Sequence, residues 1–224
     1  MIAKGSIQER PVVLISIEGL FQGGSLGEVG GAKIAGALEL AVEDNLKGIP
    51  TAAILLLETG GVRLQEANLG LAAIAEIQAA IVNLRQYQPV IAVVAGSVGC
   101  FGGMSIAAGL CSYIVMTKEG RLGLNGPQVI EQEAGVQEYN AKDRPFIWSI
   151  TGGNQRFASG LADAYVDDDR QKIREQVIDY LTQGVPQQHR SSNYSFYLAK
   201  LQQVDTAEQI TPAQVQALYQ GEQA

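Results

Sequence analysis

The stretch from Val94 to Cys111 limits most strongly what this chain can fold into, because it joins a buried strand to a helix through a glycine-rich turn. The preceding run, residues 90–94, is apolar and β-branched, which is typical of a strand covered on both faces. The turn has glycines at 96, 99, 102 and 103. Glycine lets another molecule approach main-chain N–H groups closely, and the first N–H groups of a helix lack a partner inside it. The turn therefore suits an oxyanion, although close helix packing would use the same glycines.

A second strand-to-helix turn of the same kind lies upstream. Residues 52–57 are another apolar strand candidate, and Glu-Thr-Gly-Gly-Val-Arg-Leu-Gln-Glu follows at 58–66. Main-chain N–H groups from two such turns can converge on one oxygen. We therefore predict an oxyanion hole whose donors are the N–H groups of Gly60, Gly61, Gly102 and Gly103.

Five stretches in a fixed order carry a family resemblance. They are EGLFQGGSLGE at 18–28, ETGGVRLQE at 58–66, GCFGGMS at 99–105, LNGPQVIE at 124–131 and RPFIWSITGG at 144–153. Together they resemble the β subunit of biotin-independent malonate decarboxylases, in the acyl-CoA carboxyltransferase branch of the crotonase-like superfamily. The resemblance extends over most of the chain, to about residue 165.

The resemblance also implies the fold class. Strands and helices alternate with connections too long for hairpins, which predicts parallel strands with right-handed crossovers. That pattern fits a doubly wound sheet and stacked β-β-α turns equally well, and the resemblance favours a crotonase-like (ClpP/crotonase) α/β superhelix. We expect a carboxyltransferase domain at 1–185 and a helical tail at 186–224. The expected strands are 12–17, 52–57, 90–94, 112–116 and 122–124, and the expected helices are 32–45, 64–86, 128–134, 144–151, 168–183, 194–203 and one from Pro212.

Composition excludes several classes of partner. The net charge is −7 and no long basic run occurs, which argues against a nucleic-acid surface. Cys100 and Cys111 lie in or beside apolar segments, without the spacing of a disulfide framework or a metal site. The apolar runs are too short to cross a bilayer. We expect a cytoplasmic protein that binds no metal, membrane or nucleic acid.

Several polar residues have both a functional and a structural interpretation. Arg63 follows a glycine turn, where it can bind a substrate carboxylate or phosphate, but an internal salt bridge with Glu66 is the alternative. We interpret Cys100 as a core residue and not a nucleophile, because no base lies near it in the sequence. The single histidine, His189, is expected in a solvated linker, and it is a catalytic base only if the tail folds back over the site. Trp148 is expected in the core or an interface.

Two glutamates that a crotonase-type hydratase uses are absent from this chain, which bears on the chemistry that the resemblance implies. Aligned on the glycine turn and the later Gly-Pro, the two glutamates of a crotonase-type hydratase fall on Ser105 and Gln128. Neither side chain can act as a carboxylate base, so the chain is expected to stabilise a thioester enolate without hydrating a double bond. Phe101 and Met104 are expected beside the substrate carboxylate, and Arg63, Ser105 and Gln128 complete the predicted substrate contacts.

The resemblance implies a decarboxylase subunit. The expected reaction converts a malonyl thioester on an acyl carrier protein into the acetyl thioester, together with a γ subunit. The chain itself is expected to bind no cofactor, since the thioester belongs to a prosthetic group of the phosphoribosyl-dephospho-CoA type on the carrier protein. An acyl carrier protein transferase subunit is a further expected partner. Two alternatives stay open, one half of a biotin-dependent acyl-CoA carboxyltransferase and a non-catalytic structural subunit.

Overall fold

A six-stranded sheet forms the centre of the molecule, whose computed structural model describes residues 1–205 and 210–219. The strands lie side by side in the order in which they occur in the chain. β1 pairs with β2 antiparallel, and every later pair is parallel. The strands are β1 (Ile2–Ile7), β2 (Arg10–Ser16), β3 (Ala52–Leu56), β4 (Val90–Val94), β5 (Tyr113–Thr117) and β6 (Ala164–Val166).

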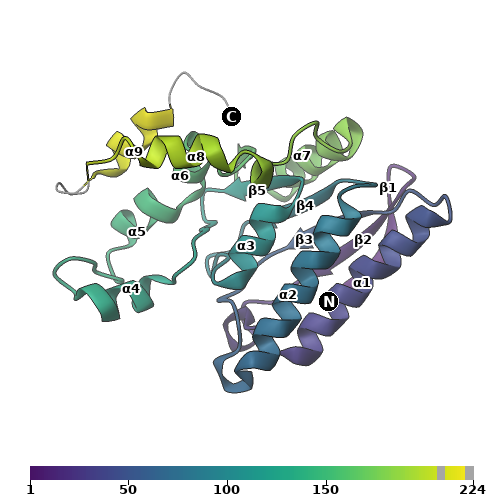
Figure 1. Cartoon of the computed structure of the whole chain (residues 1–224), viewed down its shortest axis with the longest axis horizontal. Helices are drawn as coiled ribbons and strands as arrows, with labels where there is room; N and C mark the ends of the chain where they lie inside the picture. Colours follow the sequence, from purple (N-terminus) through teal and green to yellow (C-terminus); the bar gives the residue numbers. More distant parts are fainter. Residues whose placement is uncertain (206–209, 220–224) are drawn as a thin grey trace.

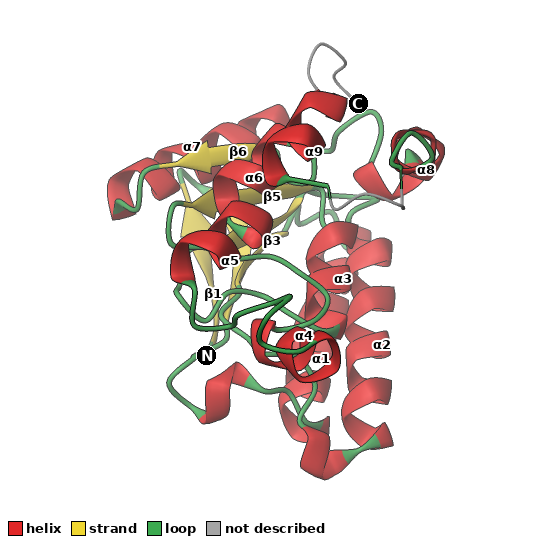
Figure 2. Ribbon diagram, turned by 90° about the vertical axis from the view of Figure 1, so that its left-hand side faces the viewer, coloured by secondary structure: helices red, strands yellow, loops and turns green. Residues whose placement is uncertain are grey.

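The sheet separates two layers of helices (Figures 1 and 2). On one face α1 (Glu28–Leu46), α2 (Asn68–Leu84) and α3 (Gly103–Leu110) pack side by side, and α7 (Arg170–Gln183) covers the other. Alternate residues of each strand therefore enter two separate apolar clusters, one beneath α1 to α3 and one beneath α7. Because the strand order never reverses, the sheet has no switch point of the doubly wound kind.

Short bridges beyond the main strands supply a second β layer. They join Leu26 to Val62, Thr59 to Cys100, Cys100 to Leu122, and Arg121 to Gly152. The strands β2 to β5 thus each continue through a turn into a bridging segment before the next helix begins. These are the stacked β-β-α turns expected from the resemblance, and the prediction of this fold is confirmed.

The remaining elements lie mostly at the later end of the sheet. α4 and α5 project away from it, and α8 and α9 lie beyond β5 (Figure 1). The remaining elements of the described residues are η1 (Gln22–Gly24), η2 (Leu64–Glu66), α4 (Pro127–Ala134), α5 (Arg144–Thr151), α6 (Gly153–Ala158), η3 (Arg190–Ser192), α8 (Tyr194–Leu201) and α9 (Pro212–Tyr219).

Some element predictions were wrong. β1 was not predicted, because five of its six residues are exposed and give no apolar pattern. β6 and α6 were also missed, since they have only three and six residues. The helix predicted at 64–86 begins at Asn68, because Ala67 has a φ of 44° and separates it from η2. Leu122 forms isolated bridge pairing and no strand of its own.

The segment after residue 185 packs back onto the rest of the chain. The Tyr197 hydroxyl donates to the carbonyl of Gly160 at 2.8 Å, and the Gln155 amide donates to the carbonyl of Pro212 at 3.2 Å. The Arg190 side chain forms an ion pair with Asp163 and is only 9% exposed. The expectation of a solvated linker around His189 was therefore wrong, whereas the domain boundary at residue 185 stays a prediction.

Residues 1–205 and 210–219 contain neither a candidate membrane span nor a candidate metal-binding cluster. No helix there is long and apolar enough to cross a membrane. No cluster of three potential metal-ligating side chains occurs there either.

Candidate functional site

The two glycine turns lie against each other. A Cβ built on Gly61 would stand 3.2 Å from the Cα of Gly102, and a Cβ on Gly102 would stand 3.2 Å from the Cα of Gly61. Both residues have positive φ, 106° and 62°, which side chains disfavour. The Thr59 N–H donates to Gly99 O at 2.7 Å, and the Phe101 N–H donates to Thr59 O at 2.9 Å. The sequence prediction that the turns converge thus agrees with the structure.

Three of the four predicted donors are already hydrogen-bonded within the chain. The Gly60 N–H donates to Gly23 O at 2.8 Å, and the Gly61 N–H donates to the Thr59 hydroxyl at 3.1 Å. The Gly102 N–H donates to Leu124 O at 2.7 Å. An N–H group has one hydrogen to donate. These three glycines therefore shape the turns and do not offer N–H groups to a ligand.

Two other N–H groups at the same junction remain available. Gly103 is the first residue of α3, where an N–H has no acceptor inside the helix. Val62 follows Gly61, and its nitrogen lies 3.8 Å from the position of a Cβ on Gly102. In the described part of the chain neither N–H has a hydrogen-bond acceptor. Gly103 was among the predicted donors, whereas Val62 was not.

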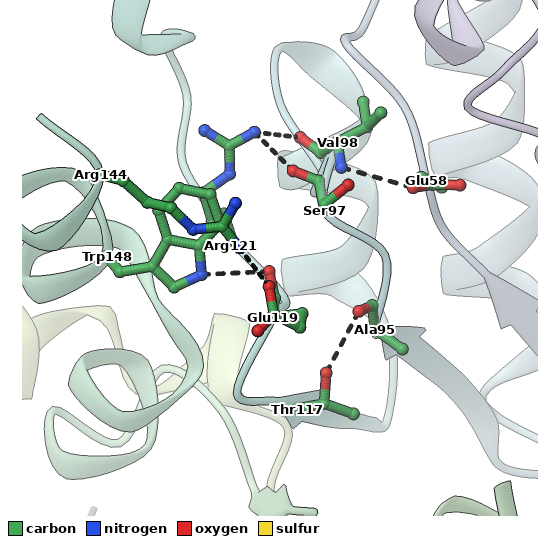
Figure 3. Close-up of polar contacts among 9 residues, drawn as sticks. All are labelled: Glu58, Ala95, Ser97, Val98, Thr117, Glu119, Arg121, Arg144 and Trp148. Atoms are coloured by element: carbon green, nitrogen blue, oxygen red, sulfur yellow. Dashed lines mark hydrogen bonds and ion pairs between the residues drawn. The ribbon is translucent and has the colours of Figure 1, made fainter. Parts of the chain in front are cut away.

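Arg121 holds the loop that leads into the second turn (Figure 3). Its Nη2 donates to Ser97 O at 2.6 Å and to Val98 O at 3.1 Å. Its own carbonyl accepts from the Cys100 N–H at 2.8 Å. The guanidinium also lies over the Phe101 ring, 5.4 Å from its centre. Burial, and to a lesser degree the nearby Arg144, lower the pKa of Arg121. No local sequence pattern indicates this role of Arg121, because it contacts the loop from about 20 residues further along the chain.

Trp148 lies between two arginines (Figure 3). Its ring centre is 4.4 Å from the Arg121 guanidinium carbon and 4.3 Å from that of Arg144. The indole N–H donates to Glu119 O at 3.2 Å, and Arg144 pairs with the Glu119 carboxylate at 2.5 Å. Such cation–π stacks contribute about 0.5–2 kcal/mol each, depending on burial. Trp148 therefore connects α5 to the loop held by Arg121, a role that the sequence did not indicate.

Glu58 connects three loops. Its Oε1 accepts from the Val98 N–H at 3.4 Å. A Cβ on Gly19 would stand 2.6 Å from its carboxyl carbon, and a Cβ on Gly96 would stand 2.2 Å from Oε1. Glu58 also lines a cavity of about 320 Å³ at the ends of β2, β3 and β4, together with Glu18. Neither carboxylate was predicted as a site residue, although each lies two residues after the end of a strand.

Arg63 and Glu66 form the internal salt bridge that was the alternative interpretation. The Arg63 Nη1 lies 2.8 Å from Glu66 Oε1, and its Nη2 donates to Ser25 O at 3.0 Å. Glu66 Oε2 accepts from the Glu28 N–H, the first of α1, at 2.7 Å. That N–H, together with the Arg63 guanidinium, lowers the pKa of Glu66. Arg63 therefore ties η2 to the start of α1, and its guanidinium is engaged within the chain.

The other predicted substrate contacts differ in their exposure. Met104 is fully buried and Phe101 is 4% exposed, because both pack inward behind the second turn. Their predicted contact with a substrate carboxylate is not compatible with this burial. Ser105 is partly exposed, but its hydroxyl donates to Gly102 O at 2.7 Å. Gln128, at the start of α4, is exposed.

Neither cysteine side chain nor the histidine is placed to react at the turns. Cys100 is fully buried, and burial raises the pKa of its thiol well above the ordinary range. The interpretation of Cys100 as a core residue is confirmed. His189 lies near Arg85, which bonds Leu110 at the C-terminal end of α3, whereas Gly103 begins that helix. The tail thus folds back, but not over the turns.

Comparisons with known proteins show the family of this chain. The family model described as the carboxyl transferase domain matches residues 1–222. A chain in the crystal structure of a Pseudomonas malonate decarboxylase hetero-tetramer in complex with malonate is 68% identical, with a TM-score of 0.94. That match covers 97% of this chain and 79% of the Pseudomonas chain.

Two further relatives are informative. The malonyl-S-ACP:biotin-protein carboxyltransferase MADC of Malonomonas rubra is 41% identical over 181 residues, which are 76% of this chain and 57% of that protein. A chain of a Pseudomonas malonate decarboxylase hetero-tetramer in complex with coenzyme A shares the fold alone, at 15% identity and a TM-score of 0.69 over 90% of both chains. The chain spans about half or less of the length of the curated relatives that it matches.

Proposed function

The chain belongs to the carboxyl transferase domain family, and we propose that it is the β subunit of a malonate decarboxylase. The observation that carries this proposal is the 68% identity to a chain of the Pseudomonas malonate decarboxylase over 97% of this chain. The reaction removes carbon dioxide from a malonyl thioester on an acyl carrier protein, and the product is the acetyl thioester. The enzyme is thus a carbon–carbon lyase.

The junction of the two turns would stabilise the charge that develops in this reaction. When the carbon–carboxylate bond breaks, its electron pair delocalises onto the thioester oxygen to form an enolate. We assign the N–H groups of Gly103 and Val62 as the donors to that oxygen, and the N-terminus of α3 adds the positive end of its dipole. A donor of this kind contributes about 3 kcal/mol to transition-state stabilisation.

The enolate then takes a proton at carbon to give the acetyl group. Ser105 is a weak candidate donor, because its hydroxyl already bonds the Gly102 carbonyl. Gln128 is exposed and has no acidic proton to give, but its amide can hold a water molecule. We propose that the proton comes from such a water or from a side chain of the paired subunit.

A paired subunit of the same fold would complete the site. The Pseudomonas relatives are hetero-oligomers, and a chain of one of them shares this fold at 15% identity. Large apolar side chains are exposed around the turns, which marks an interaction surface. They are Leu20 (94% exposed), Phe21 (64%), Leu64 (81%) and Leu124 (59%). We propose a γ subunit on this surface.

The remaining partners follow from the same proposal. An acyl carrier protein would present the thioester on a prosthetic group of the phosphoribosyl-dephospho-CoA type, which an acyl carrier protein transferase subunit would load with malonyl. The chain would bind no other cofactor, and the complex would be cytoplasmic.

One observation favours a second candidate. The Malonomonas relative is named as a carboxyltransferase that acts between malonyl-S-ACP and a biotin protein. One half of a biotin-dependent carboxyltransferase would use the same turns to stabilise the same enolate, but would pass the carboxyl group to biotin.

Turnover of malonyl carrier protein by the complex in heavy water, with and without excess avidin, separates the two functions. The decarboxylase is expected to place one solvent deuterium in the acetyl methyl group, and its activity is expected to be unchanged by avidin. Activity that avidin abolishes, or that requires added biotin carrier, would show the carboxyltransferase instead.

A further inference from the structure

A cavity of about 820 Å³ lies beyond the site described above, between the start of β5, the end of α6 and the segment around η3 and α8. It is at the opposite end of α3 from the glycine turns, because Arg85 bonds Leu110 at the end of that helix and Ser191 in η3. Eight helical residues span about 12 Å, so the cavity and the turns are separate. Its lining includes Tyr113, Phe157, Asp163, His189, Arg190 and Phe196.

Arg190 brings an incompletely paired charge to the cavity wall. Its side chain is 9% exposed, and one nitrogen, Nη2, pairs with Asp163. Its Nε and Nη1 are buried and have no acceptor within residues 1–205 and 210–219. The Asp163 carboxylate cannot easily rotate to accept from these two nitrogens as well, because its Oδ2 also accepts from the Ile114 N–H at 2.6 Å. A buried guanidinium with unmet donors is costly, which favours an additional acceptor.

His189 and the surrounding charges point to the same acceptor. The His189 Nδ1 is buried without a partner in the described ranges. Burial lowers the pKa of His189, and so do Arg85 and Arg190. Arg85 and Arg190 act on the imidazole and Asp163 pairs with Arg190, which is an excess of one positive charge among these three groups, while Asp179 acts on Tyr113 and Lys200 lies over the Phe196 ring. A single negative charge balances this cluster, whereas a phosphate dianion exceeds it.

Aromatic side chains form part of the remaining cavity wall, beside small and polar residues such as Ser159 and Gln188. Phe157, Phe196, Tyr197 and Tyr219 line it, and the Tyr197 hydroxyl is already occupied by Gly160 O. The volume is within the range of small-molecule sites and is far larger than a carboxylate group needs. We propose that this cavity binds a monocarboxylate with an apolar or aromatic body, its carboxylate against Arg190 and His189 and its body against the phenylalanines. The proposal does not depend on the function assigned to the glycine turns.

The test uses His189, which is the single histidine of the chain and therefore gives one set of imidazole NMR signals. Benzoate is titrated into the full chain at constant ionic strength. We expect a saturable shift of the His189 signals and a rise in the His189 pKa, because the bound carboxylate stabilises the imidazolium. Acetate, which lacks the apolar body, is expected to bind at least about tenfold more weakly. Benzamide, which lacks the charge, is expected to give no shift.

Two variants identify the residues responsible. Arg190→Gln is expected to abolish the benzoate response, and Arg174→Gln, on the exposed face of α7, is the matched control that keeps it. If thermal melting shows that Arg190→Gln does not fold, Phe196→Leu serves instead and is expected to weaken benzoate but not acetate. The proposal is overturned if benzoate gives no saturable shift, if benzamide competes equally, or if inorganic phosphate binds more tightly than benzoate.

Discussion

Arg121 lies over the indole of Trp148, with its guanidinium carbon 4.4 Å from the ring centre, while its Nη2 donates to the carbonyls of Ser97 and Val98 (Figure 3). Through this contact α5 supports the loop that enters α3. The N–H of Gly103 comes directly after that loop, so its position depends on side chains that do not reach the proposed substrate.

We therefore expect Arg121→Ala to lower kcat by roughly 10- to 100-fold while the subunit stays folded, since charged hydrogen bonds contribute about 1.5–3 kcal/mol each. Steady-state kinetics of the complex should show a larger change in kcat than in KM. Trp148→Phe keeps an aromatic surface under Arg121 and is the control expected to retain most activity. A normal kcat for a folded Arg121→Ala complex would show that the loop needs no such support.

The N–H of Gly103 can be tested separately from steric effects. A Cβ at this position would stand 2.8 Å from Ile74 Cγ2, so Gly103→Ala and Gly103→Pro share the steric cost. Only proline removes the N–H, and proline is tolerated at the first position of a helix. We expect kcat of Gly103→Pro to be about 100-fold below that of Gly103→Ala. Equal kcat values for two complexes of similar melting temperature would exclude this donor.

The loss of stability on replacing Glu66 by glutamine is expected to depend on pH. The Glu28 N–H and Arg63 hold its folded-state pKa below the ordinary value of 4.5. The stabilisation is therefore present above that value and is lost as the pH falls through the folded-state pKa. Glu66→Gln should have a lower Tm than the parent chain at pH 7, and the difference should shrink in acid. Glu175→Gln, in an exposed pair with Lys172, is a control expected to change Tm little.

The buried thiols should not take part in turnover. Cys100 and Cys111 are fully buried, and burial raises the pKa of Cys111 to about 12. The native complex should therefore resist iodoacetamide at pH 8, with labelling appearing only on unfolding. Cys100→Ala should remain active. Rapid inactivation that maps to Cys100 by mass spectrometry would contradict the core assignment.

The proposed γ subunit should be necessary for activity. Apolar residues around the turns are exposed in the isolated chain, and we expect a charge there to prevent assembly. Leu64→Glu should abolish co-purification and turnover together, whereas Leu46→Glu, at the far end of α1, should change neither. Full activity of the γ subunit without this chain would favour the structural-subunit alternative.

Much of the fold could be predicted because it depends on local sequence patterns. The apolar runs at 52–57 and 90–94 form β3 and β4 within one residue, and α5 occupies 144–151 as expected. Such runs indicate burial on both faces of a parallel sheet, and the glycine pairs indicate turns with positive φ. The family resemblance then selected the β-β-α superhelix, which the alternation of elements left undecided.

The donors in the site were decided only by tertiary structure. Gly60 and Gly102 appear equivalent to Gly103 in the sequence, but their N–H groups are bonded to Gly23 and Leu124. Those acceptors come from segments about 20 to 40 residues away, and no local pattern encodes such a pairing. Arg121 was missed for the same reason. The sequence alone determined where the backbone turns, whereas packing between distant segments determined which polar groups remain available, because each hydrogen bond satisfied inside the fold removes a donor from the site.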